Sequence, residues 1–506
     1  MQPQEARSFF PRNFAEFRLA LVSRPIILVM VLAGQFSIVQ ILMGAQFGDA
    51  PRNMHWGILT FEQPNFLLDG LDTYERIKGF PPDPASLGPR GEWNNEYAGL
   101  HRWWGPALPL LFAAVWAISR SQMALQLVIP LVAAGVVLLT YRFTLRYTNQ
   151  RAALIAAAFL ACYPLFREYS SVAYSESFSA LVLTAALYTY LRGRTVLTLA
   201  LGTVAALSKM DLIFLYCGVV GICMLADRIR RERYLPLVHH LVALCGPLLL
   251  ASPWIWFHYL HAGSSSPTEP FSAGLFLIIF PMMIELTFYA PWFISLLTFS
   301  AIGLVVAMGL RHRTLPPLPT IALISWFGLG LFVTLLYCAT PGAGNNPRII
   351  IPALPALAIL FGAGWPQLAV YWRRRLGAYL IALFVTVNLA VIGYNWYVYG
   401  QPVRNVQPAF AELREREPGF VLTPLYWETI LNTRQPATWF ESDPTFQANI
   451  MGDIANFTHY IETYPIRYVL LPDNDPASAA PEVRRFLEAN AESFASHSWT
   501  LYILPK

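Results

Sequence analysis

A succession of long apolar stretches restricts the fold of this chain more than any other feature of the sequence. A helix needs about 20 mostly apolar residues to cross a bilayer. Eleven stretches are predicted to be such helices: 25–43, 124–144, 152–166, 177–191, 195–209, 212–226, 236–257, 291–310, 317–339, 349–370 and 377–397. Two further apolar stretches, 106–118 and 272–289, either span the membrane or lie on its outer face, and the orientation below follows if both are juxtamembrane helices on that face. The sequence therefore predicts an all-α polytopic membrane protein.

The composition supports this fold class and excludes others. Hydrophobic residues make up 56% of the 506 residues and charged residues 13%, whereas soluble domains carry about 25% charged residues. A disordered chain and a small secreted disulfide scaffold are both excluded by these fractions. The net charge of +5 reflects arginines that signal topology in a membrane protein, so we expect no nucleic-acid partner and expect membrane lipids around the chain.

The distribution of arginine predicts the orientation in the membrane. Lys and Arg concentrate in short cytoplasmic loops, and eleven crossings place every strong basic cluster on one side. These clusters are Arg142/Arg146/Arg151, Arg192/Arg194, Arg228/Arg230/Arg231/Arg233, Arg311/Arg313 and Arg373/Arg374/Arg375. The N-terminus is then cytoplasmic and the C-terminal segment extracytoplasmic, in a multi-pass protein of the cell membrane.

This topology divides the chain into three parts. Residues 1–24 form a cytoplasmic segment, residues 25–397 a transmembrane domain whose first outer loop is 44–105, and residues 398–506 an outer tail. The tail has strand-like runs at 419–424, 467–472 and 499–504 between helical patterns at 408–416 and 481–495. Such alternation predicts a small α/β domain.

Ionisable residues at the outer ends of the predicted helices are the candidate functional residues, because charge is costly at these positions. Asp49 and Arg52 follow the first helix, Glu176 opens the fourth, Lys209 lies between the fifth and sixth, and Arg348 precedes the tenth. Cations can neutralise a phosphate leaving group while a carboxylate takes a proton from a hydroxyl. The sequence has neither a G-x-x-x-x-G-K-[ST] nor a G-x-G-x-x-G motif, so a sugar donor carried on a lipid phosphate fits better than a nucleotide sugar.

A divalent metal site is a second hypothesis for the outer face. His258 and His261 are spaced i, i+3 and could bind a metal together with Glu269 or Glu285. The alternative, that both histidines are interfacial residues without a ligand, is the more common situation. No other cofactor is expected.

Several motifs, in order along 25–397, carry a family resemblance. They are Gly48-Asp49-Ala50-Pro51-Arg52, Asn149-Gln150-Arg151-Ala152-Ala153-Leu154, Tyr163-Pro164-Leu165, Tyr174-Ser175-Glu176-Ser177, Ala185-Ala186-Leu187-Tyr188, Leu207-Ser208-Lys209 and Pro347-Arg348-Ile349-Ile350-Ile351-Pro352-Ala353-Leu354-Pro355. With them the chain resembles the GT-C-fold membrane glycosyltransferases that use polyprenyl-phosphate sugars, a group that includes protein O-mannosyltransferases and the lipid A aminoarabinose transferase.

The resemblance implies roles for individual residues. Asp49 would be the catalytic carboxylate near the acceptor and Glu176 a second acidic residue at the catalytic cavity. Lys209, Arg348 and Arg52 would hold the donor phosphate. The chain departs from the family pattern at Ala50, where many relatives have a second acid, and at Asp211, whose carboxylate could pair with Lys209.

The predicted function is therefore that of an integral membrane glycosyltransferase. It would transfer a hexose or pentose from a polyprenyl-phosphate carrier to a hydroxyl of a protein, glycolipid or glycan acceptor on the outer face, with inversion implied by the resemblance. Two alternatives stay open: a transporter or flippase of lipid-linked sugars, and an inactive scaffold with the same fold.

Overall fold

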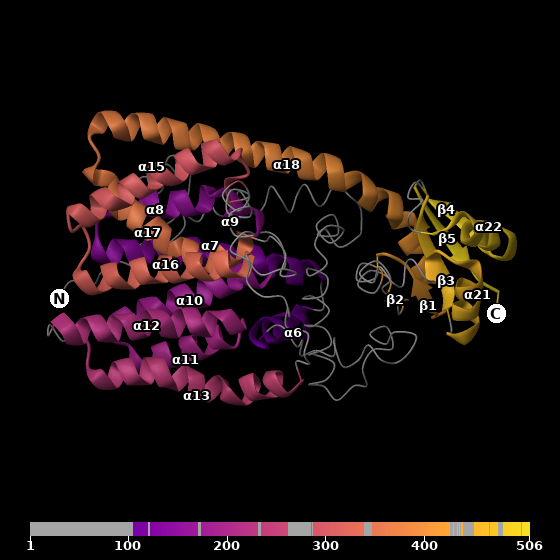
Figure 1. Ribbon diagram of the computed structural model, residues 1–506, viewed down its shortest axis with the longest axis horizontal. Coiled ribbons are helices and arrows are strands. Elements are labelled where there is room, and N and C mark those ends of the chain that lie inside the picture. The colour runs from indigo at the N-terminus through magenta and orange to yellow at the C-terminus, as the bar shows by residue number, and fades with distance from the viewer. Residues whose placement is uncertain are drawn as a thin grey trace, which may run out of the picture.

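The computed structural model describes residues 105–505, with gaps at 120–121, 171–173, 231–233, 262–284, 286, 339–346, 426–428, 430–432, 434, 436, 439–449, 465, 474–478 and 497. Two parts are visible, a helical bundle and a small sheet domain, joined by one long helix (Figure 1). Asp49, Arg52 and the first predicted membrane helix lie outside the described residues, as does most of the 272–289 stretch.

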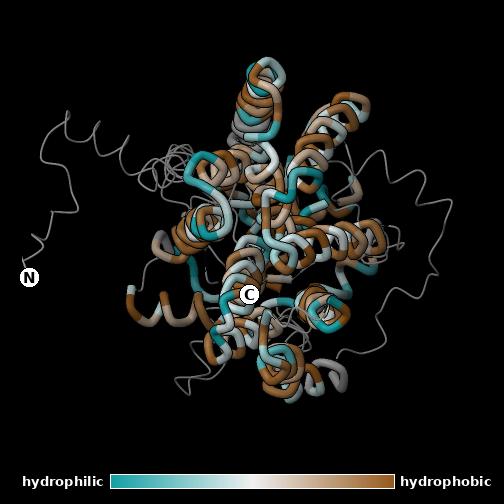
Figure 2. The backbone as a smooth tube through the Cα atoms, turned by 90° about the vertical axis from the view of Figure 1, so that its left-hand side faces the viewer, coloured by the Kyte–Doolittle hydropathy of each residue, from teal (hydrophilic) through white to brown (hydrophobic). Residues whose placement is uncertain are grey.

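Ten of the predicted apolar stretches that fall on described residues form helices, and so does the 106–118 stretch. The bundle contains α6 (Ala107–Ser119), α7 (Gln122–Tyr147), α8 (Gln150–Cys162), α9 (Pro164–Glu168), α10 (Ser175–Leu191), α11 (Thr195–Ala206), α12 (Met210–Arg230), α13 (Leu237–His261), α15 (Trp292–Arg311), α16 (Pro317–Cys338), η2 (Pro347–Ala353), α17 (Leu354–Gly364) and η3 (Trp365–Gln367). Six helical segments in the described part of the chain are long and apolar enough to cross a membrane. Along the bundle, apolar residues cover the helices and polar residues gather at the turns (Figure 2).

The stretch 349–370 is not the single continuous α-helix that the sequence predicted. It begins as the 3-10 helix η2 and becomes α-helical only at Leu354. Pro352 and Pro355 have no N–H group to donate within a regular helix. The free carbonyl of Pro352 accepts a 3.0 Å hydrogen bond from Trp326 Nε1 of α16, so the irregular segment is tied to its neighbour.

Helix α17 occupies the centre of the bundle, and small residues allow its neighbours to approach. A side chain at Gly364 would collide with the backbone of Val305 in α15, and one at Gly362 with the backbone carbonyl of Ala152 in α8. Close backbone approach at glycine is a common way to pack membrane helices, since lipid provides little hydrophobic drive for their association.

A buried polar network joins three helices at the end of the bundle where α10 and α12 finish. His240 Nε2 lies 3.1 Å from Asp227 Oδ2, and His240 Nδ1 lies 2.7 Å from the Tyr190 hydroxyl. Asp227 also accepts hydrogen bonds from the backbone N–H groups of Tyr234 and Leu235. Since each of these buried groups has partners, the network holds α10, α12 and α13 together without an uncompensated charge.

Helix α18 (Val370–Glu415) connects the bundle to the tail. The sequence predicted a membrane helix over 377–397, a boundary at 398 and a separate helix at 408–416, but one helix of 46 residues runs through all three. At 1.5 Å per residue it is about 69 Å long, more than twice the thickness of a hydrocarbon core of about 30 Å. The tail domain is therefore carried away from the bundle at the end of this helix (Figure 1).

The tail is an α/β domain, as predicted. Its elements are β1 (Phe420–Leu422), β2 (Ala437–Thr438), α21 (Ile454–Thr463), β3 (Ile466–Pro472), α22 (Pro481–Asn490), β4 (Glu492–Ser496) and β5 (Trp499–Ile503), and its strand order is β2-β1-β3-β5-β4. Strand β3 pairs in parallel with β1 and antiparallel with β5. The helix predicted over 481–495 ends at Asn490, and the residues that follow form β4.

The central strand β3 is buried on both faces. Tyr468 and Leu470 belong to a core that includes Phe410 of α18, while Val469 and Leu471 belong to one that includes Val483 of α22. Helices thus cover both sides of the sheet, which explains why the 466–472 run lacks polar alternation.

Candidate active site

Three of the predicted site residues come together at one end of the bundle. Lys209 Nζ lies 3.2 Å from Glu176 Oε1, and Arg348 Nε lies 3.2 Å from the same oxygen. Glu176 is fully buried, and Lys209 and Arg348 are 7% and 8% exposed. We call these three residues the carboxylate–cation cluster. Its side chains come from positions 33 and 172 residues apart in the chain, so only the fold brings them together.

The start of α10 fixes the position of Glu176. Ser177 Oγ donates a 2.9 Å hydrogen bond to the carbonyl of Tyr169, which follows α9, and Glu176 lies in the first helical turn. Carboxylates are favoured at this position by the positive end of the helix dipole. The chain therefore turns from α9 into α10 with the carboxylate directed at the two cations.

Aromatic rings position Arg348 from the other side. Its guanidinium carbon lies 4.5 Å from the centroid of the Tyr174 ring, and the Tyr174 ring lies 5.4 Å from the ring of Tyr169. A guanidinium over an aromatic face is attracted by the ring quadrupole. Arg348 itself is in the buried η2 segment, so both its backbone and its charged group are held.

The turn that carries Lys209 is attached to the beginning of α6. Ala107 N donates to the Leu207 carbonyl at 3.0 Å, and a Cβ at Gly105 would lie 1.8 Å from that same carbonyl oxygen. Only glycine permits this approach. Because Gly105 directly follows residues 44–104, the predicted first outer loop joins the bundle beside Lys209.

Glu168 is a fourth ionisable group near the cluster. Burial raises the pKa of its carboxyl to about 8, and its charge in turn contributes to a raised pKa of the Tyr169 hydroxyl, for which burial is the main cause. Sequence analysis singled out neither this carboxyl nor the contact of Tyr174 with Arg348. Glu168 ends α9 and Tyr174 immediately precedes α10, but nothing in the local sequence indicates which neighbours they face.

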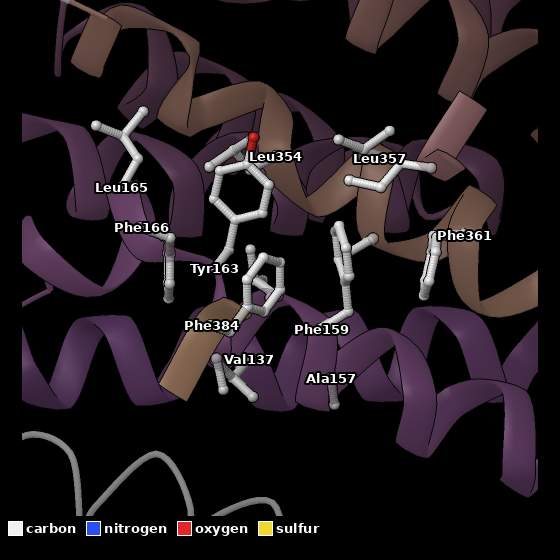
Figure 3. Close-up of a cluster of buried hydrophobic side chains, with 14 of the residues drawn as sticks. Val137, Ala157, Phe159, Tyr163, Leu165, Phe166, Leu354, Leu357, Phe361 and Phe384 are labelled. Carbon is white, nitrogen blue, oxygen red and sulfur yellow. The ribbon is translucent and has the colours of Figure 1, made fainter. Parts of the chain in front are cut away.

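An apolar groove includes Arg167 of α9 in its wall. It has a volume of about 450 Å³ and lies between α8, α17 and α18; its lining includes Phe159, Phe361, Phe384, Gly377 and, as polar residues, Arg167 and Asn388. The rings of Phe159 and Phe361 stack at 4.4 Å, and Phe384 lies beside them (Figure 3). The groove is therefore walled almost entirely by hydrocarbon and aromatic side chains.

The predicted metal ligands are only partly described. His258 and His261 lie on α13 at the expected spacing, but their side chains are outside the described residues, as is Glu269. The Glu285 carboxylate accepts a 2.8 Å hydrogen bond from the backbone N–H of Trp292 at the start of α15. Among the described residues, no group of three or more His, Cys, Asp or Glu side chains could hold a metal ion. The metal hypothesis stays a prediction.

Comparisons with known proteins agree with this architecture. The model of the dolichyl-phosphate-mannose-protein mannosyltransferase family matches residues 105–257. No curated protein sequence matches the chain.

The solved structures that the chain resembles are membrane glycosyltransferases. ArnT from Cupriavidus metallidurans bound to undecaprenyl phosphate has a TM-score of 0.63 at 13% identity, over 94% of this chain and 97% of ArnT. The oligosaccharyltransferase AglB from Archaeoglobus fulgidus, in complex with an inhibitory peptide and a dolichol-phosphate, has a TM-score of 0.52 at 13% identity, over 96% and 75%.

The arabinofuranosyltransferase AftD from Mycobacteria has a TM-score of 0.51 at 14% identity, over 94% of this chain and 41% of AftD. At these identities the likeness concerns the fold. The chain is a multi-pass membrane protein with the GT-C fold, as the order of its motifs predicted.

Proposed function

We propose that this protein is a membrane glycosyltransferase that takes a sugar from a polyprenyl-phosphate donor. The observation that carries the proposal is the carboxylate–cation cluster at the end of α10, in a chain with the GT-C fold. Two cations and one carboxylate leave a net charge of +1. A cluster with this charge can bind a phosphate group whose negative charge increases as the bond to the sugar breaks.

In this mechanism the acceptor hydroxyl oxygen attacks the anomeric carbon while the bond from that carbon to the phosphate oxygen breaks. Polyprenyl phosphate leaves with the electron pair of the broken bond. Asp49 takes the proton from the hydroxyl, and Arg52 adds a third cation to the phosphate site; both assignments rest on the sequence motif. A single displacement of this kind inverts the anomeric centre.

Glu176 acts in this mechanism as a positioning residue for Lys209 and Arg348. Both cations lie 3.2 Å from its Oε1 atom, so its negative charge is already shared between them. A carboxylate in this state is a weak proton acceptor, and the proton of the hydroxyl goes to Asp49 instead. Glu176 keeps the two long side chains in one geometry before the donor binds, which reduces the entropy lost on binding.

The apolar groove fits part of the prenyl chain of the donor. Lipid carriers of this class are long hydrocarbons, and the groove offers Phe159, Phe361 and Phe384 as walls. Arg167 of α9 lines the groove, and Tyr169, which follows α9, has its ring against that of Tyr174. We propose that the phosphate end of a bound chain lies at the Arg167 end of the groove, from which Tyr169 and Tyr174 lead to Arg348.

The test is donor consumption by the purified full-length protein. Radiolabelled polyprenyl-phosphate hexoses and pentoses are supplied in detergent with mixed membrane acceptors, and transfer is compared between wild type, Asp49→Asn and Asp69→Asn, the last being a control in the same outer loop. We expect transfer with wild type and with Asp69→Asn, and none with Asp49→Asn. Sugar that crosses a vesicle membrane without cleavage would identify a transporter instead, and a folded wild type that neither cleaves nor moves any donor would identify a scaffold.

A further inference from the structure

A second cavity lies at the end of the bundle opposite to the carboxylate–cation cluster. It has a volume of about 760 Å³ and is enclosed by the ends of α7, α12 and α15, the start of α16, and α17. Helix α12 leads from Met210, next to Lys209, to Arg230 in the cavity wall. Its 21 residues correspond to about 30 Å at 1.5 Å per residue, so the cavity is separated from the cluster by the thickness of a membrane core.

The polar part of the cavity wall is cationic and hydroxylic. Arg230 and Arg313 line it together with Tyr147, Thr314 and Thr320, and none of the lining residues within the described part of the chain is acidic. Guanidinium groups with nearby hydroxyls are suited to phosphate oxygens, which accept several hydrogen bonds at once. The wall therefore has the chemistry of an anion site.

Arg313, whose guanidinium belongs to the cavity wall, has a strained backbone. Its φ angle is 48°, in the left-handed region, where glycine is the usual residue at the end of a helix. The turn is held by hydrogen bonds from Arg313 N to the Leu310 carbonyl at 3.1 Å and from Thr314 N to the Gly309 carbonyl at 3.1 Å. An arginine in this conformation lowers the stability of the fold. The residue nevertheless is arginine, and its side chain lines the cavity.

The remaining wall is apolar and continues to the outside of the bundle. Val306, Leu310, Ile321 and Ile324 line the cavity, and Leu310 and Ile324 are 36% and 44% exposed. Exposed leucine and isoleucine on helices of this apolar character face lipid chains. A ligand with a phosphate at one end and hydrocarbon at the other thus matches both halves of the wall.

We propose that this cavity binds the headgroup of an anionic phospholipid, with its phosphate between Arg230 and Arg313 and its acyl chains along Leu310 and Ile324. Basic pockets between membrane helices recognise anionic lipid headgroups in this manner. The site is independent of sugar transfer, and the lipid would come from the leaflet at this end of the bundle.

Native mass spectrometry of the full-length protein tests the proposal. Wild type is released from nanodiscs that contain phosphatidylglycerol and phosphatidylcholine, and retained lipid is quantified. The variant R230Q/R313Q removes both guanidinium groups from the cavity. The control R142Q/R146Q removes two exposed arginines of α7 at the same end of the bundle, neither of which lines the cavity. Gel filtration and circular dichroism verify that both variants fold.

We expect wild type and the control to retain phosphatidylglycerol in preference to phosphatidylcholine. R230Q/R313Q should lose about tenfold or more in affinity for phosphatidylglycerol, as expected when charged hydrogen bonds are removed. R313G should lose part of this affinity while its backbone strain is relieved, so a loss of binding there cannot come from misfolding.

Three results would overturn the proposal. One is equal retention of both lipids by wild type, and another is an equal loss in R230Q/R313Q and in the control, which would reflect overall charge. The third concerns the source of the phosphate: if inorganic phosphate binds with the same dependence on Arg230 and Arg313 and displaces the lipid completely, the ligand is a soluble anion.

Discussion

Removing the charge of Glu176 should destabilise the protein strongly, because two buried cations depend on it. In wild type the carboxylate–cation cluster carries a net charge of +1, and Glu176→Gln raises this to +2 with Lys209 and Arg348 still buried. At 3.2 Å, each ion pair corresponds to about 5 kcal/mol of Coulomb energy for an effective dielectric constant of about 20. Part of this is offset by desolvation, and breaking a buried ion pair costs about 3–5 kcal/mol.

Replacing Lys209 should lower the free energy of unfolding less than replacing Glu176 does. This difference between the two variants can be measured. Lys209→Met leaves Glu176 paired with Arg348, whereas Glu176→Gln removes the carboxylate from both cations. The double variant E176Q/K209M leaves a single buried cation, which is better than the two in Glu176→Gln. We therefore expect the double variant to be about 1–3 kcal/mol more stable than Glu176→Gln alone, a coupling typical of residues in contact.

The measurement is equilibrium unfolding of the purified protein in mixed detergent micelles, followed by tryptophan fluorescence. Ser179→Ala serves as a control, because Ser179 is buried in the same helix and is not part of the cluster. Its unfolding free energy should stay within about 1 kcal/mol of wild type. If the costs of Glu176→Gln and Lys209→Met simply add in the double variant, or if Glu176→Gln behaves like the control, the three charges do not form one electrostatic unit.

Three other predictions concern the groove, Glu168 and η2. Gly377→Leu should raise the KM for a polyprenyl donor about tenfold. A Cβ at Gly377 meets Trp365 only at ordinary contact distance, so the fold tolerates it, and the longer leucine side chain enters the groove. The control Gly303→Leu should leave the KM unchanged, since a Cβ at Gly303 meets nothing within 4 Å. Folded Glu168, with a pKa of about 8 against 4.5 for the free group, holds a proton that the unfolded chain releases, so wild-type stability should fall as pH rises between these values. Glu168→Gln should flatten this part of the profile of thermal midpoint against pH, and parallel profiles would contradict the assignment. Trp326→Phe removes the hydrogen bond to the Pro352 carbonyl and should lower the unfolding free energy by about 1–3 kcal/mol.

The helices were predictable because each is encoded by a local property of the sequence. An apolar stretch of the length of α12 or α15 forms a helix in a membrane regardless of its neighbours, since no water is present to bond its backbone. The structure differs from the predicted helices where tertiary contacts determine the backbone conformation. Pro352 and Pro355 produce η2 because Trp326 satisfies the carbonyl that they leave free, and α18 passes through the predicted boundary at 398.

In the tail domain, too, a tertiary contact determines a structure that the local sequence does not predict. Strand β4 has the burial pattern of an exposed edge, and only its pairing with β5 stabilises it. Residues 491–495, Ala-Glu-Ser-Phe-Ala, carry no β-branched side chain, so their propensity favours a helix. The sequence therefore predicted a continuation of α22, whereas the edge of the sheet determines the structure.

For the site, the sequence identified which residues are charged at the outer helix ends but not which of them touch. The prediction that Glu176, Lys209 and Arg348 share one face agrees with their contacts. Lys209 pairs with Glu176 because the fold directs the start of α10 at the turn after α11; the side chain of Asp211 lies outside the described residues, so its pairing with Lys209 stays a prediction. The sequence does not indicate that the helix end carrying Glu176 faces the turn that carries Lys209.

The two ends of the bundle also differ in how they compensate charge, and this difference separates their proposed ligands. At the cluster, Glu176 offsets one of two buried cations and leaves a net charge of +1 that is shielded from water. At the opposite cavity, Arg230 and Arg313 are exposed and none of the described lining residues is acidic, so salt should weaken binding there by screening. Raising the ionic strength should therefore lower the amount of phosphatidylglycerol that wild type retains. The same change should raise the KM for the polyprenyl donor by a smaller factor. Equal salt dependence at both sites would mean that the burial of Glu176 and its partners does not protect the cluster from solvent.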